Sequence, residues 1–368
     1  MTNPFQDKLN TLSRLEKRRE LIPIQGIDFS SNDYLGLARH DGIRQKLMDA
    51  LAGGIALGSG GSRLLRGNHP EHEDLEAFAA DFFATDAALF MATGFLANVA
   101  LFTTLPQRGD IILVDELIHA SVKEGMHASP AKTMKFAHND ATACEEALNR
   151  ARDKGAQQIW IAVESVYSMD GDVAPLAELM EIADRHDAYL IVDEAHATGV
   201  HGPNGKGFSA AFEGRDNLVT LHTCGKALGQ AGALVTAPQL IKDYLVNAAR
   251  SFVYTTAPSP LAAVAVKSAL EVVRDEPERR TQLLDLVAHA REVFAPVGGS
   301  TQILPLMVGE DSEALKRALH LQSLGFDIRA IRTPTVPKGT ARLRLSITLN
   351  ANSAEIDSLA MAYKDACA

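Results

Sequence analysis

Short apolar runs alternate with longer amphipathic stretches from about residue 70 to residue 236. The apolar runs have the length of buried strands and cover residues 87–91, 111–114, 159–163, 189–192, 218–221 and 233–236. Amphipathic segments of helix length lie between most of them, at 71–84, 95–105, 119–128, 140–153 and 175–186. Strands that alternate with helices in this way predict an α/β fold, with a mostly parallel central sheet flanked by helices on both faces.

The pattern differs on either side of this region. Residues 6–20 place Leu9, Leu12 and Leu15 on one face among charged residues, which predicts an amphipathic helix, and a short strand follows at 27–29. After residue 260, one long helical stretch (261–295) precedes three strand candidates and a last helix; these lie around 303–308, 327–331, 342–347 and from about 353. We expect three parts, which are an N-terminal helix and short strand (1–38), a large α/β domain (39–260) and a small C-terminal α+β domain (261–368).

The composition narrows the class of protein. The 368 residues are 46% hydrophobic and 22% charged, with a net charge of −10, which argues against binding to nucleic acid or to anionic membranes. No stretch reaches the roughly 18 apolar residues that a membrane span needs, and the N-terminus does not have the pattern of a signal peptide. Three cysteines without metal-ligand spacing favour a reducing compartment. We therefore expect a soluble cytoplasmic protein without a catalytic metal.

An acid, an imidazole and a lysine follow two of the predicted strands. Asp193 ends the strand at 189–192, His196 comes three residues later, and Lys226 lies between glycines after the strand at 218–221. Taken singly, the Asp is an ordinary turn residue and the Lys an ordinary solvated one. Together they are what a pyridoxal phosphate site needs: a lysine for the Schiff base, an acid for the pyridine nitrogen and an imidazole for the ring hydroxyl.

Further candidates follow other strands of the same predicted sheet. Gly94 and Phe95 open a helix after the strand at 87–91, where free N–H groups and the helix dipole favour a phosphate, although a plain helix cap is the alternative. His119 has a position compatible with stacking on a planar ring, or with a purely structural role. Glu164 and Ser168 follow the strand at 159–163, and Ser168 either bonds the ring hydroxyl or belongs to a turn. Ligands of such sheets bind at the carboxyl ends of the strands, where all of these residues converge.

Arginines in the C-terminal part supply candidate anion-binding groups. Arg342, Arg344 and Ser346 share one face of a predicted strand, and Arg332 precedes it. One interpretation is a solvated strand face. The other is a guanidinium fork that holds the carboxylate of an amino acid.

A glycine-rich segment remains open between two interpretations. The run Gly58-Ser59-Gly60-Gly61-Ser62-Arg63 matches neither a Walker A motif nor a dinucleotide fingerprint. It is either a flexible loop or a loop that folds over the active site.

These residues resemble a known family, the α-oxoamine synthases, which are fold-type I pyridoxal phosphate enzymes. The resemblance covers nearly the whole chain. It is carried by the runs Ser31-Asn32-Asp33-Tyr34-Leu35-Gly36-Leu37, Phe136-Ala137-His138-Asn139-Asp140, Asp193-Glu194-Ala195-His196-Ala197-Thr198-Gly199 and Pro334-Thr335-Val336-Pro337-Lys338-Gly339-Thr340-Ala341-Arg342-Leu343-Arg344. Within the family, the chain is most similar to the biotin-pathway branch. That implies a decarboxylating condensation of L-alanine with a pimeloyl thioester, carried by coenzyme A or an acyl-carrier protein, to give 8-amino-7-oxononanoate, carbon dioxide and free thiol.

The resemblance also implies a role for each candidate residue. Lys226 carries the cofactor, Asp193 pairs with the pyridinium nitrogen, and His196 and Ser168 bond the ring oxygen. The ring lies between His119 and Ala195. The phosphate is held by Gly94, Phe95 and Thr223, together with Thr255 or Thr256 from a second subunit, so a homodimer with active sites at its interface is implied. Substrate binding is assigned to Asn32, Arg344 and Arg332, the last with either the departing carboxylate or the acyl chain.

Three other hypotheses remain from the sequence. The nearest is a sister synthase that joins glycine or serine to another acyl-CoA. The second is a pyridoxal phosphate aminotransferase or lyase on the same fold, which would release no thiol. The third is a non-catalytic cofactor-binding regulator, against which the complete set of Lys226, Asp193 and His119 argues.

Overall fold

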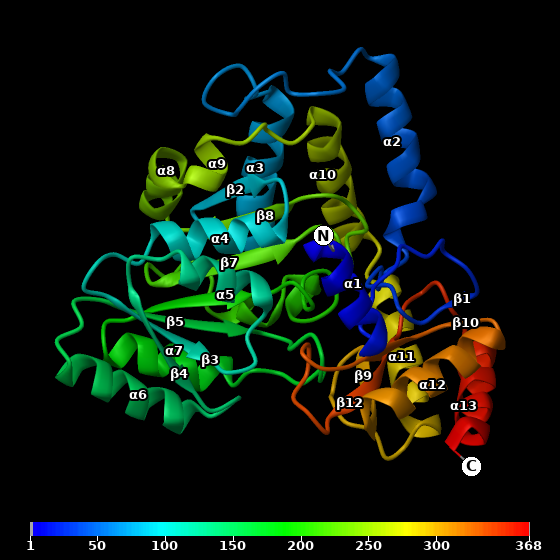
Figure 1. Ribbon diagram of the computed structural model, residues 1–368. Helices are drawn as coiled ribbons and strands as arrows, with labels where there is room; N and C mark the ends of the chain where they lie inside the picture. The colour runs from blue at the N-terminus through cyan, green and yellow to red at the C-terminus, as the bar shows by residue number, and fades with distance from the viewer. Residues whose placement is uncertain (1–2, 368) are drawn as a thin grey trace.

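The computed structural model describes residues 3–367 and is built around a mixed sheet (Figure 1). Within these residues the largest sheet has seven strands, in the order β2 (Ala87–Met91), β8 (Ala233–Ala237), β7 (Leu218–Thr223), β6 (Tyr189–Asp193), β5 (Ile159–Glu164), β3 (Ile111–Asp115) and β4 (Lys132–Phe136). The pairs from β7 to β4 are parallel, whereas β8 runs antiparallel to both of its neighbours. The predicted, mostly parallel sheet is therefore confirmed.

Alternating side chains of the strands face two hydrophobic cores. In β3, Ile112 and Val114 join the core under α4 (Gly94–Thr104) and α5 (Ala120–His127), whereas Ile111 and Leu113 join the core on the opposite face. That face is covered by α6 (Ala141–Asp153) and α7 (Leu176–Arg185), and at its β2–β8 end by α3 (Pro70–Phe83). Because both faces are buried, the strands are continuous apolar runs in the sequence.

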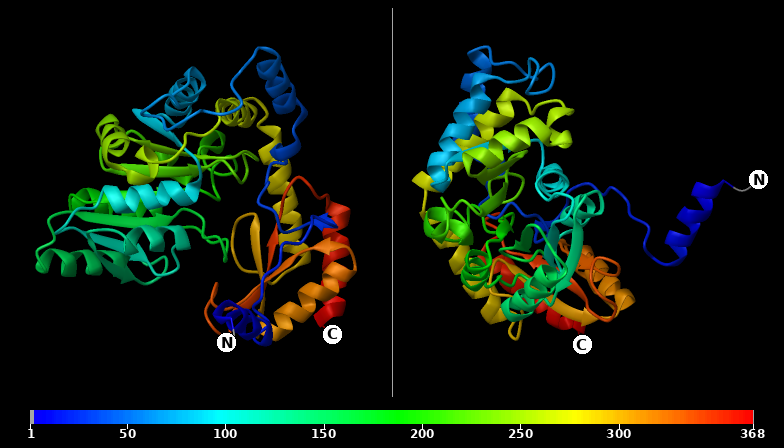
Figure 2. Two further views of the ribbon diagram at one scale, coloured as in Figure 1. Left: turned by 45° about the horizontal axis from the view of Figure 1, so that its top comes forward. Right: turned by 90° about the vertical axis from the view of Figure 1, so that its left-hand side faces the viewer.

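The C-terminal part of the chain forms a second, smaller lobe (Figure 2). A three-stranded antiparallel sheet, ordered β11 (Arg329–Ile331), β12 (Ala341–Ser346) and β9 (Ile303–Gly309), packs against α12 (Asp311–Ser323), which in turn packs on α13 (Ser353–Cys367). The short strand β10 (Phe326–Asp327) pairs in parallel with β1 (Ile27–Asp28). The N-terminal segment is thereby joined to the small lobe.

The helical stretch predicted at 261–295 is helical in the structure but is divided. The structure has two helices, α10 (Pro260–Asp275) and α11 (Glu278–Val293). Pro277 separates them because a residue that precedes proline is disfavoured in the helical region, and Glu276 has φ −117° and ψ 62°. α10 packs against α2 (Asp41–Ala52) and α3. The proposed domain boundaries at 38/39 and 260/261 stay predictions, and residues 1–2 and 368 of the outer parts lie outside the described residues.

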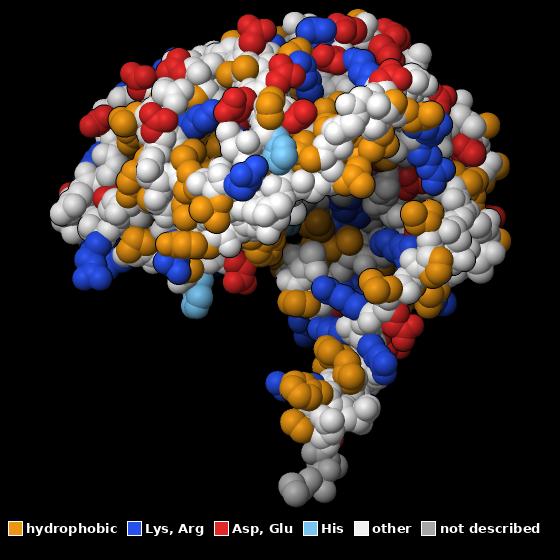
Figure 3. Space-filling model, turned by 90° about the horizontal axis from the view of Figure 1, so that it is seen from above, with side chains coloured by type: hydrophobic (Ala, Val, Ile, Leu, Met, Phe, Trp, Pro, Cys, Tyr) orange, Lys and Arg blue, Asp and Glu red, His pale blue; other side chains and the backbone are white. Residues whose placement is uncertain are grey.

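The predicted N-terminal helix is shorter than residues 6–20. It spans α1 (Pro4–Arg14) and ends because Glu16 adopts a left-handed backbone conformation with φ 54°. The helix stands clear of the body and carries apolar and basic side chains (Figure 3), and Leu9, Leu12 and Leu15 are exposed. No residue of α1 is buried, so the amphipathic pattern of this helix does not correspond to a buried face in the described residues.

Several elements were missed in the sequence. They are the edge strand β4, with its two lysines, and the helices α2, α8 (Gln239–Ala248), α9 (Arg250–Val253) and α12. β4 is largely exposed, so it lacks the apolar run of a buried strand. Among residues 3–367, no helix is both long and apolar enough to cross a membrane.

Candidate active site

Most of the site residues predicted from the sequence meet at the carboxyl edge of the large sheet. Asp193 ends β6, Thr223 ends β7, Glu164 ends β5, and Gly94 and His119 follow β2 and β3. They line a cavity of about 370 Å³, together with Asn32, Phe95, Ala195 and Lys226. Small-molecule sites typically have volumes of about 300–1,000 Å³. The cavity is therefore large enough for a small ligand.

Lys226 is held by a network of buried polar groups. Its Nζ lies 2.8 Å from His196 Nε2, and His196 Nδ1 lies 2.7 Å from the Tyr34 hydroxyl. Tyr34 in turn donates to Asn32 Oδ1 at 3.0 Å. This sequence of bonds is satisfied when Lys226 donates to Nε2 and His196 carries its proton on Nδ1. Burial holds the pKa of His196 well below its usual value, with the neighbouring charge of Lys226 acting in the same direction, which favours the neutral imidazole.

The environment of Lys226 makes its amine easier to deprotonate. Burial lowers the pKa of Lys226 to about 8, although the carboxyl groups of Asp193 and Glu164 act in the opposite direction. A lysine with a lowered pKa has a larger fraction of neutral amine near pH 7, and the neutral amine is the form that acts as a nucleophile or base. Burial therefore increases the fraction of Lys226 in the neutral form.

Asp193 is fixed by two hydrogen bonds at the bottom of the cavity. Its side chain is buried, Asn98 Nδ2 donates to Oδ2 at 2.8 Å, and the Ala195 N–H donates to Oδ1 at 2.9 Å. Asn98 also donates to the Ser121 hydroxyl at 2.9 Å, which lies 2.7 Å from His119 Nδ1. Asp193 and His119 are thus oriented by the same amide.

One end of the cavity has the features of a phosphate site. Thr93 caps α4 by accepting from the Leu96 N–H, so the free N–H groups of the first turn open toward the cavity. A Cβ at Gly94 would lie 2.4 Å from Thr223 Cγ2. Only glycine fits there without displacing Thr223, which brings the backbone of α4 close to the end of β7.

Two further groups have pKa values shifted by burial. Burial, and then the charge of Asp193, raises the pKa of Glu164 to about 8, and its Oε1 has no partner among the described residues. Burial lowers the pKa of His119, which favours a neutral imidazole at the N-terminus of α5. Titratable groups shifted by burial and by specific neighbours are typical of functional sites.

Arg344 reaches the same network from the small lobe. Its Nη2 donates to Asn32 Oδ1 at 3.0 Å and lies 3.4 Å from the Tyr34 hydroxyl, while Nε donates to the Ser168 carbonyl at 2.5 Å. All residues of β12 are buried, so the interpretation of Arg342, Arg344 and Ser346 as a solvated strand face is wrong. Arg342 forms an ion pair with Asp170.

Six predicted site residues do not line this cavity. His196 and Arg344 belong to the hydrogen-bonded network of Lys226, and the other four are Ser168, Arg332, Thr255 and Thr256. Ser168 lines a neighbouring cavity of about 470 Å³, and its carbonyl is occupied by Arg344. Arg332 is half-exposed, and Thr255 and Thr256 follow α9. Their assigned contacts with cofactor, substrate or a second subunit stay predictions.

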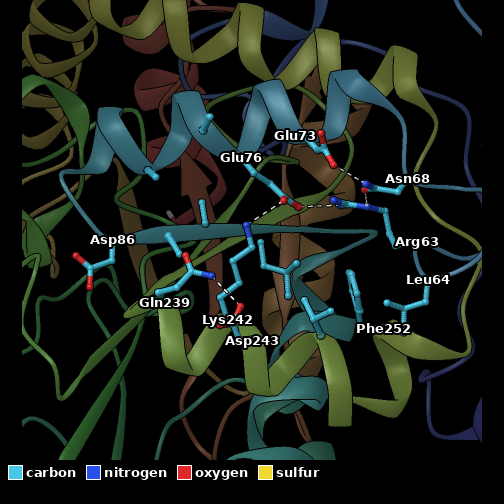
Figure 4. Close-up of a pocket in the computed structure, with 16 residues that line it drawn as sticks. Arg63, Leu64, Asn68, Glu73, Glu76, Asp86, Gln239, Lys242, Asp243 and Phe252 are labelled. Atoms are coloured by element: carbon cyan, nitrogen blue, oxygen red, sulfur yellow. Dashed lines mark hydrogen bonds and ion pairs between the residues drawn. The ribbon is translucent and has the colours of Figure 1, made fainter.

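The glycine-rich segment 58–63 is anchored away from the cavity within this chain. Ala257 donates from its N–H to the Gly61 carbonyl at 2.9 Å, and Arg63 pairs with the buried Glu76 at 2.8 Å. Glu76 also pairs with Lys242 at 3.2 Å, in a separate cavity of about 520 Å³ (Figure 4). None of the residues proposed above for cofactor or substrate lines it, and the interpretation of 58–63 as a loop that folds over the active site is untested.

Sequence reasoning missed Tyr34 and Asn98 as site residues. Asn98 lies one helical turn after Gly94 on α4 and lines the cavity, so its spacing from Gly94 could have indicated it. Tyr34 lies two positions after Asn32, outside any helix, and reaches the site through its hydrogen bonds to Asn32 and His196. Tyr is often buried at least in part, whereas Asn is mostly exposed, so the burial of Asn98 is a signal that only the structure supplies. Among residues 3–367, no group of three or more His, Cys, Asp or Glu side chains has an arrangement that would hold a metal ion.

The chain is similar over nearly its whole length to known proteins. The family model of the class I and II aminotransferases matches residues 24–362. An 8-amino-7-oxononanoate synthase from Chromobacterium violaceum is 40% identical over 373 residues, covering 97% of this chain and 96% of the relative.

Solved structures agree with these sequence matches. A substituted serine palmitoyltransferase from S. paucimobilis, with a bound PLP–myriocin aldimine, superposes with a TM-score of 0.88 at 24% identity, covering 98% of this chain and 96% of that one. An 8-amino-7-oxononanoate synthase from Francisella tularensis gives 0.77 at 27% identity, covering 92% and 97%. The predicted fold-type I architecture is confirmed.

Proposed function

Because the chain belongs to the class I and II aminotransferase family and, within it, to the 8-amino-7-oxononanoate synthases, which are pyridoxal phosphate-dependent acyltransferases, we propose that it condenses L-alanine with a pimeloyl thioester. The products are 8-amino-7-oxononanoate, carbon dioxide and the free carrier thiol, whether that carrier is coenzyme A or an acyl-carrier protein. The observation that carries the proposal is the continuous network from Lys226 through His196, Tyr34 and Asn32 to Arg344. It joins a reactive lysine to a guanidinium suited to a carboxylate.

The cavity fits pyridoxal phosphate. The glycine-opened turn of α4 suits a phosphate, Asp193 presents a carboxyl group at the cavity floor, and the Asn98 Oδ1 and Glu164 Oε1 atoms are buried without partners among the described residues. Lys226 would attach the cofactor covalently, Gly94, Phe95 and Thr223 would hold its phosphate, and Asp193 would pair with its ring nitrogen. When bound, pyridoxal phosphate supplies an electron sink for a carbanion at the amino-acid α-carbon.

The chain's own residues would supply the remaining functions. The neutral amine of Lys226 takes the α-proton and later returns a proton to the same carbon. His196 holds that amine through Nε2, while His119 and Ala195 enclose the site from opposite sides and exclude water. Arg344 and Asn32 bind the amino-acid carboxylate through charge-assisted hydrogen bonds. Arg332 would assist at the departing carboxylate or contact the acyl chain, and Ser168 would bond the ring oxygen.

A homodimer is part of the same proposal. The aromatic side chains of Phe95 and Tyr254 are 48% and 74% exposed, and Phe95 borders the cavity. Exposed aromatic side chains beside a site are typical of protein interfaces. Burial of this surface against a second copy would bring Thr255 or Thr256 of that copy to the phosphate, as the family resemblance implies.

We expect L-alanine to be preferred over glycine and serine. With pimeloyl-CoA and alanine, mass spectrometry should detect 8-amino-7-oxononanoate, with one thiol released for each product molecule. The kcat/KM for alanine should exceed that for glycine by at least about tenfold, because a single methyl group in a fitted pocket is worth about 10–200-fold. Preference for glycine or serine would favour a sister synthase. Turnover without thiol release would favour an aminotransferase or lyase.

Cofactor attachment should depend on pH in the range set by Lys226. Burial lowers the pKa of this amine to about 8, so its protonated, non-nucleophilic form dominates below that pH. We expect the rate at which the apoenzyme recovers its cofactor absorbance to rise about tenfold per pH unit below pH 8 and to level off above it. The stopped-flow absorbance of apoenzyme mixed with pyridoxal phosphate measures this. A rate that continues to rise up to pH 10 would contradict it.

A further inference from the structure

A partly buried charged cluster lies beside the active site. His138 follows β4 and bridges two carboxyl groups, with Nδ1 2.9 Å from Asp115 Oδ1 and Nε2 2.7 Å from Asp172 Oδ2. Asp115 ends β3, and Asp172 lies in the loop that follows β5. The imidazole therefore joins the ends of three neighbouring strands of the sheet.

The bridge is reinforced on both sides. Asn139 donates from its backbone N–H to Asp115 Oδ2 at 2.9 Å and from Nδ2 to Asp172 Oδ2 at 2.7 Å. The ring of His138 packs edge-on against Tyr167, with centroids 4.4 Å apart. Burial alone would lower the pKa of His138, but the hydrogen bonds that its ring nitrogens donate to the two carboxylates raise it to about 10. At pH 7 the ring is therefore an imidazolium that donates from both nitrogens.

The loop tied by this cluster (residues 167–172) holds the small lobe. The Ser168 carbonyl accepts from Arg344 Nε, Asp170 pairs with Arg342, and the Gly171 carbonyl accepts from Thr301 Oγ1 at 2.9 Å. Within the loop, the Tyr167 N–H donates to the Asp172 carbonyl at 3.0 Å. The backbone of Asp172 is thus bonded to Tyr167, the residue directly before Ser168, whose carbonyl orients the Arg344 guanidinium.

We propose that His138 is a positioning residue, which holds Asp172 against Asp115 and thereby fixes the 167–172 loop and the direction of the Arg344 guanidinium. The inference rests on the proposed role of Arg344 in binding the amino-acid carboxylate. His138 does not line the cavity that contains Lys226 and Asp193. It acts through a loop that has ion-paired and hydrogen-bonded contacts at both ends.

Replacing Asp172 tests whether the bond from His138 to the 167–172 loop affects alanine binding, and it leaves the bond from His138 to Asp115 in place. In Asp172→Ala the bond from His138 to the loop is lost, whereas its bond to Asp115 remains. We expect the L-alanine concentration that gives half of the visible absorbance change of the holoenzyme to rise roughly tenfold, with kcat at saturating alanine nearly unchanged. Asp172→Asn should restore most of the affinity, because its amide oxygen still accepts from His138.

The matched control is Glu145→Ala. Glu145 lies on α6 and also pairs with a histidine, His186 Nε2 at 2.9 Å, which directly follows α7. This variant should bind alanine as the wild type does. A second variant, His138→Gln, donates to only one of the two carboxyl groups and should weaken alanine binding in the same direction, so the test does not depend on Asp172→Ala folding.

The outcomes separate the two proposals. Wild-type affinity for alanine in folded Asp172→Ala and His138→Gln would overturn the role of His138 and leave the proposed function intact. Equal loss in Glu145→Ala would also overturn it, because the effect would then be general destabilisation. A wild-type holoenzyme whose absorbance responds to neither alanine, glycine nor serine would contradict the proposed function, and with it this inference.

Discussion

Replacement of Lys226 by alanine should abolish turnover, with a loss of more than about 10⁴-fold. General acid–base catalysis alone contributes roughly 10²–10⁴-fold, and this variant also loses the covalent attachment of the cofactor. The remaining site would still contain Asp193 and Arg344, so some cofactor and alanine would bind. The measurement is steady-state thiol release with alanine and pimeloyl-CoA, together with absorbance of the bound cofactor.

Lys267→Ala provides the control for this experiment. Lys267 pairs with Asp74 on the surface, outside the cavity, and surface ion pairs contribute little to stability. Its removal should leave turnover unchanged. Retention of more than about 1% of wild-type turnover by Lys226→Ala would contradict the assignment, because acid–base catalysis of even about 10²-fold would already be lost.

Asp193→Asn should have the second-largest effect, with turnover falling at least about 10²–10³-fold. The carboxyl group accepts hydrogen bonds from two fixed donors, Asn98 Nδ2 and the Ala195 N–H. An asparagine amide has one acceptor and one donor group. Its NH₂ group would therefore face one of the two fixed N–H donors, and that hydrogen bond would be lost. An unsatisfied buried donor costs about 1–3 kcal/mol, and the negative charge that would stabilise a protonated ring nitrogen is also lost. Turnover and the rate of cofactor release in dialysis measure both effects.

Asp110→Asn is a matched control, because Asp110 is similarly buried and also accepts from fixed donors. These are Trp160 Nε1 at 3.1 Å, the Gln107 N–H at 2.7 Å and the Gln158 N–H at 3.2 Å. Asp110 precedes β3, at the opposite edge of the sheet from the site. The control should lower the thermal unfolding midpoint without changing cofactor retention. Near-native turnover in Asp193→Asn would show that its carboxyl group is not needed at the ring nitrogen.

Much of the large lobe could be read from the sequence for one physical reason. Strands buried on both faces must be continuous apolar runs, so β2, β3, β5, β6, β7 and β8 were found within two residues of their ends. The exposed edge strand β4 and the helices α2 and α8 were not, because their residues are only partly buried and give a weak pattern. The break at Pro277 was visible in the sequence and was missed.

The sequence by itself determined which residues meet at the carboxyl edge of the sheet. Parallel strands all end at that edge, so Gly94, His119, Asp193 and Lys226 converge there whatever the helices between them contribute. Only the tertiary structure decided what completes the site. Arg344 and Asn32 are 312 positions apart and meet because the small lobe packs on the N-terminal segment through β1 and β10. Such a contact depends on how two lobes pack, and no local periodicity encodes it.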